Sequence, residues 1–127
     1  MRLAILANRE QKDEILSLGI SDDCSIYWLR SVEEINKVST VDALFDMLFE
    51  ENKYDTSYLK SFSSGTVFVN SVNRTIEEIA VPVIRINGWP GFLKRPVAEM
   101  ICNKDDKKNE AETILNLLTL DITLTVR

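Results

Sequence analysis

Residues 2–19, "RLAILANREQKDEILSLG", join a continuous apolar run to a charged segment with helix signals, and this stretch decides the fold class. A run such as 2–7, with one charge at its start, is typical of a strand that is buried on both faces of a sheet. Asn8 and Gln11 are spaced as a capping box, and Gly19 is a good stop for the helix that they open. The stretch therefore predicts a strand–helix unit of an α/β domain.

Strand-like and helix-like segments alternate along much of the remaining chain. Strands are expected at 24–30, 41–49, 65–71, 82–87, 96–102 and 122–127. Helices are expected at 31–38, 50–63, 75–80 and 103–119, with Ser31–Glu34 and Thr75–Glu78 as further capping boxes. Because strand–helix–strand units favour a parallel sheet, the sequence predicts an α/β fold. We expect a Rossmann-like, doubly wound, mostly parallel sheet of about seven strands with helices on both faces.

Length and composition limit the possible functions. The 127 residues predict a single Rossmann-like domain, 1–127, with no helical C-terminal domain. A net charge of −5 argues against a nucleic-acid partner, because phosphate binding needs a basic face. No apolar run is long enough to span a membrane, and the first one is too short for a signal peptide. We therefore expect a cytoplasmic protein with no membrane partner.

The reactive residue types are few. The chain has no histidine, so the commonest general base and the commonest zinc ligand are missing. Cys24 and Cys102 lie far apart in the sequence and have no metal-binding spacing, so we interpret them as buried thiols. We expect no metal site.

Three segments carry a resemblance to a known family: "VDALFDMLFE" (41–50), "FVNSVNRTIEEIA" (68–80) and "RINGWPGFLKRPVAEM" (85–100). Together with the order of the expected strands and helices, they resemble the N-terminal NAD-binding domain of the 3-hydroxyacyl-CoA dehydrogenase family. That family includes the 3-hydroxybutyryl-CoA dehydrogenases of fatty acid metabolism. The resemblance extends over nearly the whole chain.

The resemblance implies a cofactor site and a set of partners. NAD is the implied cofactor, and the matching positions for it are Asn8, Arg9, Asp46, Asn70 and Ser71. An acyl-CoA is the implied second ligand. The implied partner is a helical substrate and dimerisation domain, or a second copy of the chain.

The resemblance also implies a catalytic pair. Asn87 and Glu99 have the spacing of the family's catalytic histidine and of the glutamate that orients it. An amide cannot take a proton from a hydroxyl at neutral pH, so the pair is degenerate. Independent hydride transfer is therefore not expected.

Two further departures from the family concern the cofactor. The turn "LANREQKDE" (6–14) has no glycine, although a dinucleotide fingerprint needs glycines for close backbone approach to the pyrophosphate. Glu10 adds a negative charge there. The expected second strand ends in Trp28, Leu29 and Arg30, where ribose recognition calls for an acid. These departures argue against ordinary NAD binding.

Each candidate residue also has a structural interpretation. Glu99 is either a structural acid or a cleft acid paired with Arg85, Lys94 or Arg95. Asn87 precedes a glycine, so it either forms a turn or bonds a ligand at the end of its strand.

For Trp89 and Arg9 too, the sequence allows both a structural and a functional interpretation. Trp89 either covers the edge of the sheet or offers a stacking surface. Arg9 is either a solvated first-turn arginine or a group that grips phosphate.

Three functions compete on this evidence. The first is a divergent dehydrogenase-family domain that retains a nucleotide or acyl-CoA cleft. The second is a structural or protein-interaction module whose cleft is filled. The third is the cofactor half of an active NAD-dependent 3-hydroxybutyryl-CoA dehydrogenase that uses Lys94 or Glu99. The shape of the turn between the first strand and the first helix distinguishes them, because a nucleotide needs an open cleft at that turn.

Overall fold

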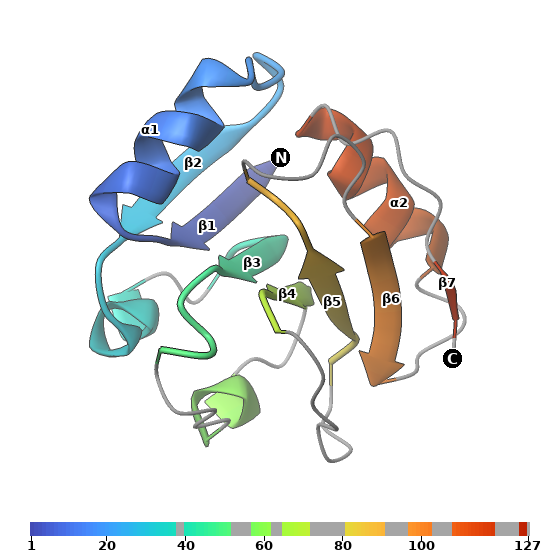
Figure 1. Cartoon of the computed structure of the whole chain (residues 1–127). Coiled ribbons are helices and arrows are strands. Elements are labelled where there is room, and N and C mark those ends of the chain that lie inside the picture. The colour runs from blue at the N-terminus through green and yellow to red at the C-terminus, as the bar shows by residue number, and fades with distance from the viewer. Residues whose placement is uncertain are drawn as a thin grey trace.

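The computed structural model describes residues 1–37, 40–51, 57–61, 65–71, 81–90, 97–102, 108–118 and 125–126. Their strands form one sheet, with two α-helices and two 3₁₀ helices packed against it (Figure 1). The strands are β1 (Arg2–Leu6), β2 (Ser25–Leu29), β3 (Ala43–Asp46), β4 (Thr66–Val69), β5 (Val83–Asn87), β6 (Val97–Cys102) and β7 (Thr125–Val126). The α-helices are α1 (Arg9–Ser17) and α2 (Lys108–Leu117), and the 3₁₀ helices are η1 (Val32–Lys37) and η2 (Ser57–Ser61).

The sheet is mostly parallel, as the sequence predicts. Its order is β2-β1-β3-β4-β5-β6-β7, and every neighbouring pair is parallel except β5 and β6. The chain starts in β1, places β2 on one side of it, and then places β3 on the other side. The carboxyl ends of β1, β2, β3 and β4 consequently meet at the same edge of the sheet.

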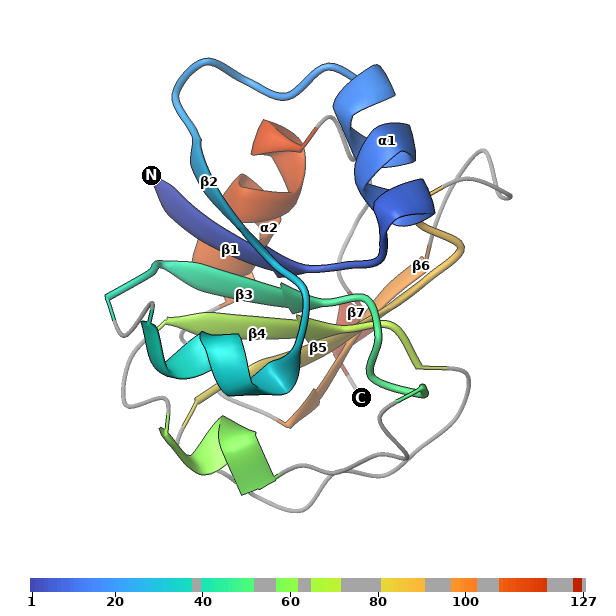
Figure 2. The same cartoon turned by 90° about the vertical axis from the view of Figure 1, so that its left-hand side faces the viewer.

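Two apolar clusters fill the two faces of the sheet. On one face α1 and α2 cover β1, β3, β4, β5 and β6, where Phe45 and Phe68 stack with ring centroids 4.3 Å apart (Figure 2). On the other face η1 and η2 contribute Ile35, Tyr58 and Leu59 to the second cluster. Because both faces are buried, the central strands read as continuous apolar runs rather than as alternating ones.

Several expected elements differ in length or type. The strand expected at 41–49 ends at Asp46, and the helix expected at 31–38 is the 3₁₀ helix η1. Within the stretch 50–63, the described part contains only the 3₁₀ helix η2. The helix expected at 75–80 lies outside the described residues.

Asp46 explains why β3 is short. Its carboxylate Oδ1 accepts a hydrogen bond from the backbone N–H of Leu48 at 3.0 Å. A side chain that bonds the backbone two residues further on mimics a turn, so it diverts the chain from the strand. The apolar run of 41–49 is therefore half strand and half buried turn.

In the described part of the chain, no helix has the length and apolar character needed to cross a membrane.

Candidate functional site: a cationic cavity at the carboxyl edge of the sheet

A cavity of about 720 Å³ opens where β1, β2 and the turn after β3 end beside the first turn of α1. Open α/β sheets bind ligands outside the carboxyl ends of their strands, at the point where the strand order reverses. In this sheet the order reverses at β1. The cavity is lined by Ala7, Asn8, Arg9, Lys12, Asp13, Trp28, Leu29, Arg30 and Leu48. Its place in the fold makes it the leading candidate for a ligand site.

The turn from β1 into α1 is built by the predicted capping box. The Asn8 side chain accepts the N–H of Gln11 at 2.8 Å, and the Gln11 side chain accepts the N–H of Asn8 at 3.0 Å. The box uses two amides that a glycine-rich turn would offer to a ligand. Arg9 lines the cavity, whereas Glu10 is not among the lining residues. The acid that the sequence places near the expected phosphate position therefore does not line the cavity.

Positive charge dominates the cavity wall. Arg9, Lys12 and Arg30 line it together with one acid, Asp13, on a chain whose net charge is −5. Lys12 lies over the Trp28 indole, with its Nζ 5.3 Å from the ring centroid. A cation over an aromatic face is held by electrostatic attraction, so the indole fixes this ammonium at the wall. The arrangement suits an anionic ligand.

Asp46 lies beside the cavity but does not line it. Its side chain is completely buried, and it accepts hydrogen bonds from the Tyr58 hydroxyl and from the Leu48 N–H. Burial raises the pKa of the Asp46 carboxyl to about 6, although both hydrogen bonds act to lower it. Because Leu48 itself lines the cavity, Asp46 positions that part of the wall through the backbone.

A shared carbonyl links the first turn of α1 to the segments that follow β3 and β4. The Met47 carbonyl accepts a hydrogen bond from the Gln11 side-chain amide at 3.2 Å and a longer one, 3.5 Å, from the Asn70 side-chain amide. Ser71 is completely buried, and within the described part of the chain its hydroxyl has no hydrogen-bond partner. Asn70 and Ser71 are not lining residues of the cavity. Of the five predicted cofactor residues, the structure brings Asn8 and Arg9 to the cavity wall.

Asn87 and Glu99, the pair that the resemblance implies to be catalytic, lie on the neighbouring strands β5 and β6. Asn87 is opposite Val97, and Arg85 is opposite Glu99. Since side chains two apart on a strand share a face, all four point to the same side of the sheet. Arg85 donates from Nη2 to Oε2 of Glu99 at 2.7 Å, and the Arg85 side chain is only 5% exposed. Of the three partners considered for Glu99, Arg85 is found, while Lys94 and Arg95 lie outside the described residues.

Trp89 belongs to the core. It is 5% exposed and packs against Phe45, with ring centroids 5.7 Å apart and the planes tilted by 55°. Its indole N–H is buried and has no hydrogen-bond partner among the residues that the structure describes. Trp89 therefore packs as a structural residue and does not line the cationic cavity.

Sequence reasoning did not identify Lys12, Trp28 and Arg30 as site residues. A signal for them was present: Arg9 and Lys12 are three apart on a helix and so share a face, and Trp28 and Arg30 end the second strand. What the sequence did not reveal is that the strand and the helix bring their cations to one cavity. Trp28 and Arg30 counted only as departures from an expected acid.

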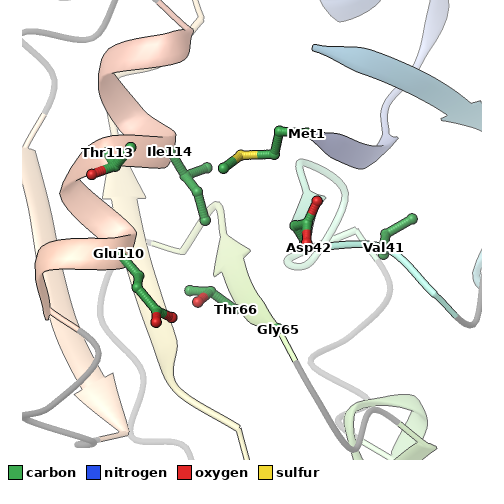
Figure 3. A pocket seen from close by; sticks show the side chains of 8 residues that line it. All are labelled: Met1, Val41, Asp42, Gly65, Thr66, Glu110, Thr113 and Ile114. Carbon is green, nitrogen blue, oxygen red and sulfur yellow. The ribbon is translucent and has the colours of Figure 1, made fainter. Parts of the chain in front are cut away.

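A second cavity, of about 400 Å³, lies at the opposite end of the sheet. Glu110, Thr113 and Ile114 of α2 line one side of it, facing Val41 and Asp42 across the hollow (Figure 3). This is the amino end of the strands, where α/β sheets do not place their ligands. Among the described residues, no three acidic or cysteine side chains gather where they could hold a metal ion.

Comparisons with protein-family models, with curated proteins and with solved structures give no match for this chain.

Proposed function

We propose that this chain is a divergent, doubly wound Rossmann-like domain of the 3-hydroxyacyl-CoA dehydrogenase family that binds an adenine dinucleotide and does not transfer hydride by itself. The reversal of strand order at β1 supports the doubly wound assignment, as do the helical segments on both faces of the sheet. The family assignment rests on the three sequence segments that resemble it.

One observation carries the ligand-binding part: the first turn of α1 opens on a cavity of about 720 Å³ rather than on packed side chains. A helix N-terminus favours negative charge, and here Arg9 and Lys12 add to that preference. Neither Arg9 nor Trp89 fills the space, since Arg9 is exposed at the wall and Trp89 is buried against Phe45. An open, cationic cleft favours a nucleotide-binding domain over a module with a filled cleft.

The chemistry of Asn87 and Glu99 supports the absence of hydride transfer. Oxidation of a hydroxyl needs an oriented base near the reacting proton. Asn87 supplies an amide in place of that base, and Glu99 is engaged by the guanidinium of Arg85. Under this proposal, Asn87 and Glu99 on β5 and β6 therefore do not supply the proton acceptor that hydride transfer needs.

Isothermal titration of the full chain with NAD and NADH tests the proposal. We expect heat of binding from at least one of them, and a loss of about tenfold in affinity for Arg9→Glu. An acid is favourable in the first turn of a helix, so this variant keeps α1 while it repels phosphate. Arg2→Gln is the control, because Arg2 contacts Tyr27 and Thr40 on the amino side of β1.

A parallel assay follows NADH oxidation in the presence of acetoacetyl-CoA, where we expect no rate above that of buffer. Absence of heat from both nucleotides would remove the ligand-binding part and favour an interaction module. A measurable turnover would instead favour the cofactor half of an active enzyme.

A further inference from the structure

We infer that the cationic cavity recognises an adenosine nucleotide whose ribose carries a phosphomonoester, rather than a free ribose diol. This inference rests on the proposed function and specifies the ligand of the same cavity. It follows from the residues at the end of β2, from the positive charge of the cavity wall, and from the hydrogen bond that Glu34, an acid after β2, accepts from the Arg30 backbone.

The residue that follows β2 is decisive for ribose recognition in folds of this type. An acid there bonds the 2′-hydroxyl, whereas an arginine accommodates a phosphate on the ribose. In this chain Leu29 ends β2, and both Leu29 and the next residue, Arg30, line the cavity. The wall therefore has a guanidinium where a diol-binding site would have a carboxylate.

The nearest acids after β2 do not restore a diol site. The Glu34 carboxylate Oε2 accepts the backbone N–H of Arg30 at 3.1 Å, so it caps the chain as it enters η1. Neither Glu33 nor Glu34 is a lining residue of the cavity. Instead, Glu34 fixes the backbone that carries the Arg30 side chain.

The cavity has more cations than are needed to bind a single phosphate at the first turn of α1. Arg9 and Lys12 come from α1, and Arg30 comes from the opposite wall, after β2. Within the described residues, no ion pair joins any of the three to an acid. Asp13 offsets only one of these three charges, so the cations still repel one another, and a ligand with a further dianionic group relieves this repulsion. A phosphomonoester carries close to two negative charges near neutral pH.

Two common cofactor chemistries present such a group: a 2′-phosphate, as in NADP, and a 3′-phosphate, as in coenzyme A. The test therefore uses adenosine 2′,5′-bisphosphate and adenosine 3′,5′-bisphosphate, with 5′-AMP as the diol reference. Inorganic phosphate is the reference for simple charge. Titrations of the full chain at low ionic strength are appropriate, because salt screens exposed cations.

We expect at least one bisphosphate to bind tenfold or more tightly than 5′-AMP, and the tighter of the two identifies the position of the phosphate. Arg30→Gln should bring the bisphosphate to within twofold of 5′-AMP, because it should weaken the bisphosphate at least fivefold more than it weakens 5′-AMP. Arg9→Gln should instead weaken all three nucleotides together. Arg2→Gln, at the other end of the sheet, should change none of these affinities.

Equal affinities for 5′-AMP and both bisphosphates would overturn the inference and leave the proposed function intact. Inorganic phosphate that binds as tightly as the bisphosphates would overturn it too, because the cavity would then be a plain anion site. If no nucleotide binds, both the inference and the proposed function fail.

Discussion

The buried carboxyl of Asp46 makes the stability of this protein depend on pH in an unusual direction. Its pKa is raised to about 6 in the folded protein, from an ordinary value of 3.8, chiefly because burial disfavours the charged form. Between these two values the folded protein holds a proton that the unfolded chain releases. The free energy of unfolding must therefore fall as the pH rises through this window.

The magnitude follows from the two pKa values. A folded pKa of about 6 against 3.8 corresponds to about 3 kcal/mol over the whole titration, of which about 2.5 kcal/mol is lost between pH 3.8 and pH 6.5. Most paired carboxylates in folded proteins have the opposite effect: their pKa is lowered on folding, so the protein loses stability as the pH falls. Asp46 therefore offsets part of the acid sensitivity that other carboxylates bring.

Urea denaturation of the wild type and of Asp46→Asn, at intervals from pH 4 to pH 7.5, isolates this contribution. The asparagine keeps an acceptor for the Leu48 N–H but has no proton to bind. The difference in unfolding free energy, wild type minus variant, should fall by about 2.5 kcal/mol across the series. Asp13→Asn, which removes an exposed carboxylate from α1, controls for the loss of one charge.

A second variant tests the cause directly. The hydroxyl of Tyr58 donates to Asp46 and lowers its pKa, so Tyr58→Phe should move the fall in stability to higher pH. The side-chain carboxyl ¹³C shift of Asp46 should titrate in parallel. A difference curve that stays flat from pH 4 to pH 7.5, or an Asp46 carbon that titrates near its ordinary value, would refute the reasoning.

Three further predictions concern the stability of the fold. Glu99→Gln should lower the free energy of unfolding in urea by about 3 kcal/mol, because it leaves the buried Arg85 guanidinium without its carboxylate. The double variant Arg85→Met, Glu99→Leu should recover most of that loss. A cost below about 0.5 kcal/mol for the single variant would contradict this prediction. Gly65→Ala should lower the melting temperature more than Gly19→Ala does. Both glycines have a positive φ, so both variants are strained. An added Cβ at Gly65 would also lie 2.8 Å from the Asp42 carbonyl oxygen, whereas at Gly19 it would meet nothing within 4 Å. Equal shifts would argue against the close approach. Asn8→Ala should cost about 1 kcal/mol through loss of the N-cap, and Asn8→Ser should restore most of it, as measured by urea denaturation followed by helical circular dichroism.

The sequence predicted the elements whose signals are local. The Asn8–Gln11 capping box is present, α1 is followed by Gly19 with a φ of 76°, and the central strands lie where continuous apolar runs predict them. These features depend on neighbours in the chain, so a single sequence carries enough information. The mostly parallel character of the sheet also followed, because strand–helix alternation favours crossover connections.

The sequence could not predict features that depend on contacts across the sheet. The end of β3 at Asp46 depends on burial of the carboxyl and on its hydrogen bonds to Leu48 and Tyr58, which come from a turn and a distant 3₁₀ helix. The cationic cavity likewise requires that α1 and the end of β2 bring Lys12 and Arg30 to the same cavity. Residue types indicated charge at each place, but only the fold shows that the charges converge.

Two departures from the resembled family, the missing glycines and the added cations, have a common physical consequence. The capping box of Asn8 and Gln11 occupies two amides at the start of α1, so fewer backbone donors are left for a phosphate. Arg9, Lys12 and Arg30 supply the missing positive potential through side chains instead. Side chains at an exposed wall are screened by salt more strongly than a buried backbone cradle. Under the proposed function, nucleotide affinity should therefore weaken steeply between 20 and 200 mM salt, because the Debye length shortens about threefold over that range. A salt-independent affinity would mean that the backbone still carries the phosphate and that the cations serve another purpose.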